Sequence, residues 1–425
     1  MSAVARELAS AFSWRRWRDP AAWSTWADIF AILIAASLPW STTLVAIFAA
    51  AFLVSMAPFL DVRGFVQSLK RPICVLPLAL FALALAGTLW SDVPWAERLH
   101  ALGQASKLLM LPVLLYHFER SARGLQVMIA FLVSCVLLML MSFVVAFDPG
   151  LALKSGAEYG VPVKNYIDQS QEFALCAVVL AYPAVTLWRA NRTWLAALLI
   201  AISLCLVANM LFVAVSRTAL VTMPIMLAVF ALLHLQWRSV VIVACVTAVL
   251  GGAVWAASPK LRWTAETFVR DYRLYKEHNT PTSIGLRLEF YRKSLRFISE
   301  APFIGHGTGS IRELFEQAAV DQRGAAAEVI ANPHNQTLNV AIQWGVIGIV
   351  VLYAMWLVHL MLFRGEGLAT WIGLMVVVQN IFTSLFNSHI FDFTEGWMYV
   401  LGVGIAGGML LRNLRETTTR NSAQP

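Results

Sequence analysis

The sequence predicts an all-α, polytopic integral membrane protein. Hydrophobic residues make up 59% of the 425-residue chain and charged residues only 13%, and the mean hydropathy is +0.69. Soluble domains carry roughly 45–50% apolar and about 25% charged residues, so the bilayer must be the main solvent of this chain. The apolar residues fall into twelve runs, and a single long polar segment, residues 257–336, interrupts them.

Each run approaches the roughly 20 residues that a membrane-spanning helix needs. The expected spans are residues 22–39, 42–60, 72–90, 100–116, 124–147, 171–187, 193–214, 218–235, 239–256, 337–363, 367–387 and 396–411. The chain is therefore expected to divide into helices 1–9 (residues 1–256), the polar segment (257–336), helices 10–12 (337–411) and a cytoplasmic tail (412–425). The tail is expected to fray from Thr417 onward, because it is polar and terminal.

The distribution of Lys and Arg predicts the orientation. With both termini in the cytoplasm, the inner segments hold sixteen of these residues, whereas the short outer loops hold only Arg98, Lys154 and Lys164. Cytoplasmic loops carry the excess of positive charge and long loops are exempt from this rule, so residues 257–336 are expected outside the cytoplasm. The N-terminal residues have the character of a basic amphipathic tail and not of a cleavable signal peptide.

Several classes of site are not expected. The five cysteines all lie in apolar runs without metal-ligand spacing, so neither disulfides nor a cysteine site is predicted. No nucleotide-binding loop is present, and no nucleotide, nucleic acid or other cofactor is expected. The chain has no Asp-x-Asp motif on the outer face, and the remaining acids are expected to be scattered among loops, which predicts no divalent-metal site; they are Asp148, Glu158, Asp168, Asp392 and Glu395.

The polar segment carries eleven Lys and Arg, which indicates an anionic, lipid-linked substrate at the membrane boundary. Residues 259–278 and 284–300 have helical composition. In the second, apolar residues recur at steps of three and four and predict one buried stripe, formed by Ile284, Leu288, Tyr291, Leu295 and Ile298. Such a helix lies on a membrane or packs across the mouth of a bundle.

Arg292 and Arg296 flank this stripe on one side, and Arg287 flanks it on the other. The arginines either bind phosphate or only snorkel toward headgroups. Arg217 lies between two expected spans with no room for a long loop, and Lys107 lies inside the fourth span. An ionisable residue at membrane depth is costly and is a functional candidate by default. Arg217 suits a phosphate ligand or an interfacial anchor, and Lys107 suits a second phosphate contact or a buried partner for an acid.

Two further motifs stand in the polar segment. Gly305, His306 and Gly307 belong to a glycine-rich turn that precedes a helix and that either presents backbone N–H groups to an anion or simply connects two helices. His334 follows a proline and immediately precedes the next span. An imidazole titrates near neutral pH, so His334 could accept a proton from a sugar hydroxyl, although a structural role is the alternative.

In their order and spacing, four motifs resemble the O-antigen ligase/polymerase superfamily: Ser216-Arg217-Thr218-Ala219, Gly285-Leu286-Arg287-Leu288-Glu289-Phe290-Tyr291, Pro302-Phe303-Ile304-Gly305-His306-Gly307-Thr308-Gly309 and Pro333-His334-Asn335-Gln336-Thr337-Leu338. The resemblance implies a GT-C-like glycosyltransferase of the bacterial inner membrane. Its donor would be a glycan linked to undecaprenyl pyrophosphate, presented at the periplasmic face.

The resemblance also implies roles for individual residues. Arg217 and Arg287 match the arginines thought to hold the pyrophosphate, and His334 matches the proposed base. Asn335, Lys107, Arg292, Gly305, His306 and Gly307 are further candidates for substrate binding. Two arginines and one histidine can neutralise a leaving pyrophosphate and deprotonate a hydroxyl, which implies a metal-independent reaction that inverts the anomeric carbon.

Twelve spans with one large late periplasmic loop favour the O-antigen ligase, which transfers the glycan to a sugar of the lipid A–core oligosaccharide. The alternatives are an O-antigen polymerase or an O-linked protein oligosaccharyltransferase of the same superfamily. A lipid-linked glycan flippase is less favoured, because a transporter would distribute its charges along several spans. In this sequence the cationic residues gather at one face.

Overall fold

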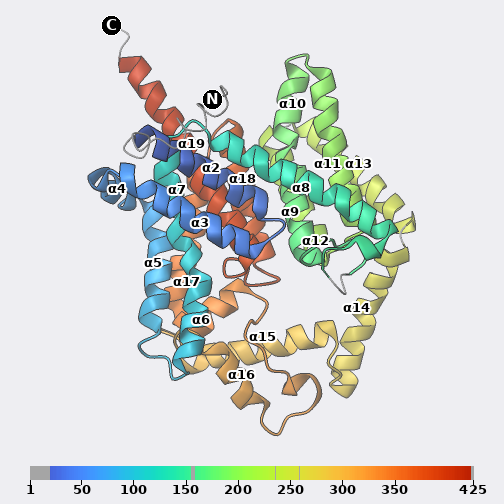
Figure 1. Cartoon of the computed structure of the whole chain (residues 1–425). Coiled ribbons are helices and arrows are strands. Elements are labelled where there is room, and N and C mark those ends of the chain that lie inside the picture. The colour runs from blue at the N-terminus through green and yellow to red at the C-terminus, as the bar shows by residue number, and fades with distance from the viewer. Residues whose placement is uncertain (1–19, 155–157, 235, 258, 423–425) are drawn as a thin grey trace, which may run out of the picture.

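The protein is helical throughout the part that the computed structural model describes, which comprises residues 20–154, 158–234, 236–257 and 259–422 (Figure 1). No strand occurs in these ranges, which confirms the all-α prediction. The helices are α2 (Pro20–Ser37), α3 (Thr42–Met56), α4 (Val62–Leu69), α5 (Pro72–Gly87), α6 (Trp95–Ala105), α7 (Met110–Phe118), α8 (Gly124–Phe147), α9 (Tyr166–Val179), α10 (Ala181–Arg189), α11 (Thr193–Phe212), α12 (Arg217–His234), α13 (Trp237–Ala257), α14 (Pro259–His278), α15 (Ser283–Glu300), α16 (Ile311–Ala319), α17 (Gln336–Leu362), α18 (Leu368–Thr383) and α19 (Phe393–Ser422).

These helices confirm a polytopic membrane protein. Within the described residues, eight helices or joined helices are long and apolar enough to cross a membrane, and α4 with α5, which meet at a bend of 80°, can supply a ninth span. Residues 221–233 of α12 and all of α18 are apolar but shorter. Each of the twelve expected runs overlaps a helix, although the run at 171–187 crosses the break between α9 and α10 at Leu180. The count of twelve spans stays a prediction.

Two expected spans differ in their bounds. The run at 100–116 is not one helix, because a short 3₁₀ turn, Ser106–Leu109, separates α6 from α7 and contains Lys107. The run at 367–387 ends early, because α18 stops at Thr383. Residues 384–392 therefore form a loop between α18 and α19, which we call the α18–α19 loop. Ile390 and Phe391 pack this loop into the core, and its polar residues add the hydrogen bonds described below.

The last helix is longer than expected. Residues 412–422 continue α19, although a frayed tail was predicted from Thr417 onward. Arg412 pairs with Glu416 at 2.9 Å, one helical turn away, and Arg415 pairs with the buried Glu119 at 2.6 Å. Because Glu119 lies at the end of α7, this ion pair fixes the extension to the bundle. The charged residues of the tail therefore form ion pairs that stabilise the helical extension.

The core of the bundle surrounds α19, whose buried face packs on α7 and α18. Small residues allow the close approach. A Cβ on Gly404 would lie 2.9 Å from the Cβ of Leu114, and one on Gly408 would lie 2.7 Å from the Cβ of Phe118. Helix association in lipid depends on such small-residue contacts, because lipid tails are as apolar as the side chains they replace. This packing sets the position of the α18–α19 loop at one end of the bundle.

The predicted helices of the polar segment are confirmed as α14 and α15. Figure 1 shows α14 running away from the bundle and α15 returning across it, with α16 beside α15. The predicted stripe of α15 is wrong in part, since Leu288 and Leu295 are 41% and 62% exposed. The buried face centres on Phe290 and Phe297, which pack with Ile311, Phe315 and Ile342. Residues of α16 and α17 cover that face, and this long-range packing determines which side of α15 is buried.

The glycine-rich turn between α15 and α16 joins α17 at a kink. Gly345 interrupts α17 with φ 59° and ψ −152°. At this break the N–H of Val346 donates to the carbonyl of Pro302 at 2.8 Å, and the N–H of Gly307 donates to the carbonyl of Gln343 at 2.9 Å. The turn therefore satisfies backbone groups that the kink releases from the helix, as a buried helix break requires. This connection fixes the N-terminal half of α17 against the polar segment.

We predict that Gly305→Ala and Gly345→Ala each sharply reduce the yield of folded protein. Both glycines have positive φ, which costs other residues roughly 1–2 kcal/mol. A Cβ would also lie 2.4 Å from backbone of Gln343 at Gly305, and 2.3 Å from backbone of Phe303 at Gly345. Thermal unfolding and size-exclusion chromatography in detergent measure the effect. Gly103→Ala in α6 is the control, because no heavy atom lies within 4 Å of its Cβ; equal behaviour of all three variants would contradict the prediction.

Candidate functional site

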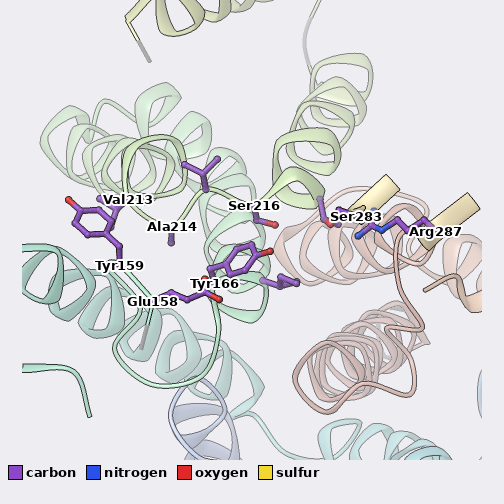
Figure 2. Close-up of a pocket in the computed structure, with 11 residues that line it drawn as sticks. Glu158, Tyr159, Tyr166, Val213, Ala214, Ser216, Ser283 and Arg287 are labelled. Atoms are coloured by element: carbon purple, nitrogen blue, oxygen red, sulfur yellow. The ribbon is translucent and has the colours of Figure 1, made fainter. Parts of the chain in front are cut away.

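A cavity of about 500 Å³ lies where the N-terminal ends of α9, α12 and α15 meet. Tyr166 opens α9, Ser216 directly precedes α12, and Ser283 opens α15. Figure 2 shows Ser283 and Arg287 facing the residues of the other two helix ends across the cavity. Asn165 and Thr282 already accept N–H groups of the first turns of α9 and α15. The partial positive charge of the three helix N-termini around one cavity still favours an anionic ligand. The complete lining is Glu158, Tyr159, Tyr166, Ile167, Val213, Ala214, Val215, Ser216, Thr218, Ser283 and Arg287.

Arg287 is the basic residue of this lining, and Glu158 is its acidic residue. Among the described residues, the Arg287 guanidinium has no carboxylate within ion-pair distance. Other arginines of the polar segment are paired: Arg292 with Glu289 at 2.6 Å and Arg296 with Glu300 at 3.1 Å. An exposed, unpaired guanidinium on a cavity wall is available for a phosphate.

Arg217 is the first residue of α12, between Ser216 and Thr218, which both line the cavity. Its side chain lies outside the part of the chain that the structure describes. The backbone nevertheless agrees with the predicted position, at the junction of two helices with a connection of only four residues, 213–216. The role of Arg217 in holding an anion stays a prediction.

Arg292 and Arg296 lie on a different surface of α15 from Arg287, as predicted from their positions on opposite sides of the apolar stripe. Both line a second hollow of about 230 Å³, together with Glu289 and Lys293. Their side chains are 71% and 63% exposed and are already paired with acids of the same helix. Arg296 and Glu300 form an exposed pair, which contributes little to stability, whereas Arg292 pairs with the buried carboxylate of Glu289. Both arginines remain candidates for a surface contact and not for the cavity.

His334 occupies a constrained backbone position just before α17. Its φ is +54°, in the left-handed region that residues other than glycine seldom adopt. The side-chain oxygen of Asn332 accepts the N–H of His334 at 3.0 Å, forming a turn around Pro333. Asn335 then caps α17 by accepting the N–H of Leu338 at 3.1 Å. The strain is maintained by these flanking bonds, and strained backbone of this kind is common at functional sites.

The imidazole of His334 is half-buried between α15 and the α18–α19 loop. Its ring stacks on Phe290, with centroids 6.0 Å apart, and its Nδ1 lies 3.0 Å from Oδ1 of Asn387. Burial lowers the pKa of His334, the hydrogen bond with Asn387 opposes this effect, and the charge of Arg287 lowers the pKa further. His334 is therefore neutral at neutral pH, which is the form that a general base requires.

The glycine-rich turn does not offer its backbone to an anion. The N–H of His306 donates to Ile342 at 2.9 Å, that of Gly307 to Gln343, and that of Gly309 to the side chain of Gln343 at 2.7 Å. The N–H of Gly305 donates to the carbonyl of Ala301 at 3.1 Å, and the His306 ring bonds the carbonyl of Phe297. These contacts favour the simple helix connection over the anion-binding interpretation. The turn supports α17 and, through it, His334.

Lys107 is buried and contacts backbone. Its ammonium donates to the carbonyls of Phe391 at 2.8 Å and Asp392 at 2.6 Å, and its side chain is absent from the lining of the cavity. The burial of Lys107 disfavours the predicted phosphate contact, and its hydrogen-bond partners are these backbone carbonyls and not the carboxylate that the other interpretation predicted. Lys107 holds the α18–α19 loop against the 3₁₀ turn between α6 and α7. The loop that carries Asn387 is therefore anchored to the bundle.

The expectation that the acidic residues are scattered is wrong for two of them. The ligand atoms of His389, Asp392 and Glu395 all lie within 4.8 Å of one another, a spacing that could hold a cation. Nδ1 of His389 lies 3.2 Å from Asp392 and 3.7 Å from Glu395, at ion-pair distance but without hydrogen-bond geometry. Although burial opposes the charged form, Glu395 and Asp392 raise the pKa of His389 to about 10. A protonated His389 balances the two carboxylates.

Sequence reasoning missed Asn387, Asn332 and Asp392 as neighbours of His334. Asn387 was assigned to a span because the apolar run continues to it. A usable signal was the density of polar residues between 387 and 395 in an apolar region, because polar residues at membrane depth are costly. The hydrogen bonds of these residues, however, connect positions more than 50 residues apart.

The fold and this site define a polytopic membrane protein with a cavity at three helix N-termini, lined by Arg287 and Glu158, and a neutral histidine on which the charge of Arg287 acts. Residues 202–353 match the sequence model of a family described as O-antigen ligase, and this match supports the resemblance to the O-antigen ligase/polymerase superfamily. The matched segment contains Arg217, Arg287 and His334 and extends from α11 into α17. No curated protein matches the chain.

Proposed function

We propose that the protein transfers an O-antigen glycan from undecaprenyl pyrophosphate to a sugar hydroxyl of the lipid A–core oligosaccharide. The observation that carries this proposal is the cavity in which three helix N-termini and the unpaired Arg287 meet. The family match supports a glycosyltransferase-like activity of this superfamily. The orientation expected from the positive charges puts this reaction at the periplasmic face of the inner membrane.

In the proposed reaction, the pyrophosphate of the donor occupies the cavity beside Arg287 and Arg217. His334 takes the proton of the acceptor hydroxyl while its oxygen bonds to the anomeric carbon of the glycan. The bond between that carbon and the pyrophosphate oxygen breaks, and undecaprenyl pyrophosphate leaves with the electron pair. Attack from the side opposite the leaving group inverts the anomeric carbon. The arginines offset the charge that develops on the leaving group, and catalysis depends chiefly on such stabilisation.

The test is reconstitution of the reaction with purified full-length protein. Undecaprenyl-pyrophosphate glycan and rough lipopolysaccharide are incubated without metal or nucleotide, and glycan-bearing lipopolysaccharide is the expected product. Elongation of the donor glycan without transfer to lipopolysaccharide would instead identify an O-antigen polymerase. Transfer to a hydroxyl of an added protein acceptor would identify an O-linked protein oligosaccharyltransferase.

Transfer should persist in excess EDTA, because arginines and helix N-termini take the part that a metal would play on the pyrophosphate. The rate is measured with and without EDTA, and then with added magnesium or manganese. Lipopolysaccharide packing needs a separate control, since divalent ions bridge its phosphates. A complete loss of transfer that a metal restores would overturn the prediction, and His389, Asp392 and Glu395 would then be the first residues to replace.

A further inference from the structure

The orientation of the Asn387 amide follows from its neighbours. The side-chain nitrogen of Asn387 lies 2.6 Å from Oδ2 of Asp392. A carboxylate only accepts hydrogen bonds, so the NH₂ group of Asn387 must face Asp392. The amide oxygen of Asn387 then faces His334 Nδ1, at 3.0 Å.

Asn332 fixes the same orientation independently. Its Oδ1 accepts the backbone N–H of His334 at 3.0 Å and the hydroxyl of Ser388 at 2.7 Å. A backbone N–H can only donate, so the NH₂ group of Asn332 points the other way, and it donates to Oδ1 of Asn387 at 2.8 Å. The Asp392 carboxylate can only accept a hydrogen bond, and the backbone N–H of His334 can only donate one. Both groups independently require that the amide oxygen of Asn387 faces Nδ1 of His334.

We propose that Asn387 is the positioning residue of His334: its amide oxygen accepts Nδ1–H and leaves Nε2 as the basic nitrogen. This inference rests on the proposed function for its catalytic meaning, because it says which atom of the general base receives the proton. The hydrogen bond of the second ring nitrogen determines the tautomer of a histidine. Asn387 also limits rotation of the ring, which Phe290 supports from its face.

The rest of the loop holds Asn387 in place. Asp392 receives the Asn387 amide through its side chain and the Lys107 ammonium through its backbone carbonyl. Nδ1 of His389 lies 3.2 Å from the same Oδ2 of Asp392 that accepts the Asn387 amide. This arrangement explains why the loop places several charged groups beside an uncharged asparagine. These charged groups hold the Asn387 amide in place. Because the amide itself carries no charge, it positions His334 without fixing the ring in its charged form.

The tautomer can be observed without any activity. The full-length protein is labelled with ¹⁵N-histidine, and the signals of His334 are identified by their loss in His334→Asn. At a pH where His334 is neutral, we expect a protonated Nδ1 and an unprotonated Nε2. The reverse pattern would overturn the assignment of the proton whether or not the protein transfers a glycan.

Two substitutions test the positioning role. Asn387→Leu removes the acceptor at similar size, and the turnover rate should fall on the order of 10²-fold with KM for the donor unchanged, because the reacting nitrogen loses its position. Asn387→Asp keeps an oxygen facing Nδ1 but replaces the NH₂ group that lies 2.6 Å from Oδ2 of Asp392 with a second carboxyl oxygen. Two carboxyls at that distance share one proton, which takes the place of the amide donor, so this variant should restore most of the loss. Tyr291→Phe is the matched control, since it removes a 2.9 Å hydrogen bond to Leu385 of the same loop and a 3.3 Å bond from Asn335 but makes no hydrogen bond with Asn387.

The pH profiles of the two variants should differ. Arg287 of α15 and His389 and Asp392 of the α18–α19 loop act on His334 in all variants. In Asn387→Leu, loss of the Asn387 bond disfavours the imidazolium and moves the acidic limb of the turnover rate to lower pH. In Asn387→Asp, the proton shared with Asp392 leaves the net charge beside His334 unchanged, so the limb should stay close to that of the wild type. A folded Asn387→Leu variant with wild-type turnover and profile would overturn the inference, while inactivity of His334→Asn would still support the proposed base.

Discussion

His334→Ala is expected to abolish glycan transfer while the protein folds and inserts normally. Loss of a general base typically slows a reaction about 10²–10⁴-fold. Binding of the donor should be unchanged, because Arg287 and the helix N-termini line the cavity and His334 does not. The measurement is the single-turnover rate at saturating donor, with donor affinity determined separately. His334→Asn is the companion variant, since asparagine tolerates the left-handed backbone at φ +54°.

The pH dependence of the wild-type protein should agree with this role. A base must be neutral to accept a proton, and burial, opposed by Asn387, lowers the pKa of His334 below its usual 6.5. The turnover rate should therefore be constant near neutral pH and fall only as the pH drops below about 6.5. His278→Ala is the control, because His278 is an exposed histidine at the end of α14 in the same polar segment. Wild-type turnover in a folded His334→Ala variant would make His334 a structural residue.

The sequence was sufficient for features that depend on local pattern. Helix α14 was predicted from Pro259 to His278 and α15 from Ile284 to Glu300, and the structure agrees to within one residue. The separation of Arg287 from Arg292 and Arg296 was also predicted, because helical geometry alone puts them on different flanks. The structure assigns the two groups to separate hollows.

The buried face of α15 shows where local pattern fails. Leu288 and Leu295 fit the periodicity, yet Phe290 and Phe297 are buried, because α16 and the N-terminal half of α17 pack on that side. Periodicity identifies apolar residues but does not say which partner covers them. In a membrane protein an apolar residue on the helix surface can also face lipid, so exposed leucines carry no penalty there.

The neighbours of His334 could not be predicted for a related reason. Asn332 and Asn387 lie 55 residues apart in sequence, and Lys107 reaches the same loop from 285 residues away. Each contact depends on the kink of α17 and on the packing of α19, which no short motif encodes. Sequence pattern alone therefore assigns the first part of the α18–α19 loop to an apolar span and predicts that Asp392 and Glu395 lie apart.

Arg287→Lys should cost about tenfold to a hundredfold in transfer rate, although it keeps the positive charge. Arginine presents a planar fork of donors that fits two phosphate oxygens, whereas lysine is a point charge on a flexible stem. The loss of one charge-assisted hydrogen bond corresponds to roughly 1.5–3 kcal/mol, or one to two orders of magnitude in rate or affinity. Arg217→Lys should behave in the same way if its side chain enters the cavity that Ser216 and Thr218 line.

Arg292→Gln and Arg296→Gln are the matched controls, since both residues lie on the same helix as Arg287 but line a different hollow. Each removes a positive charge, so a general electrostatic attraction of α15 to anionic lipid would suffer more from them than from Arg287→Lys. The pyrophosphate role predicts the opposite order, because only Arg287 faces the cavity and only Arg287 lacks a carboxylate partner among the described arginines of this helix. Transfer rates and donor affinities of all four variants, measured in the same vesicles, give this order directly. If all four variants showed equally small losses of transfer rate, the positive charge of the polar segment would act only as a membrane anchor. Arg217 and Arg287 would then have no role in the proposed mechanism.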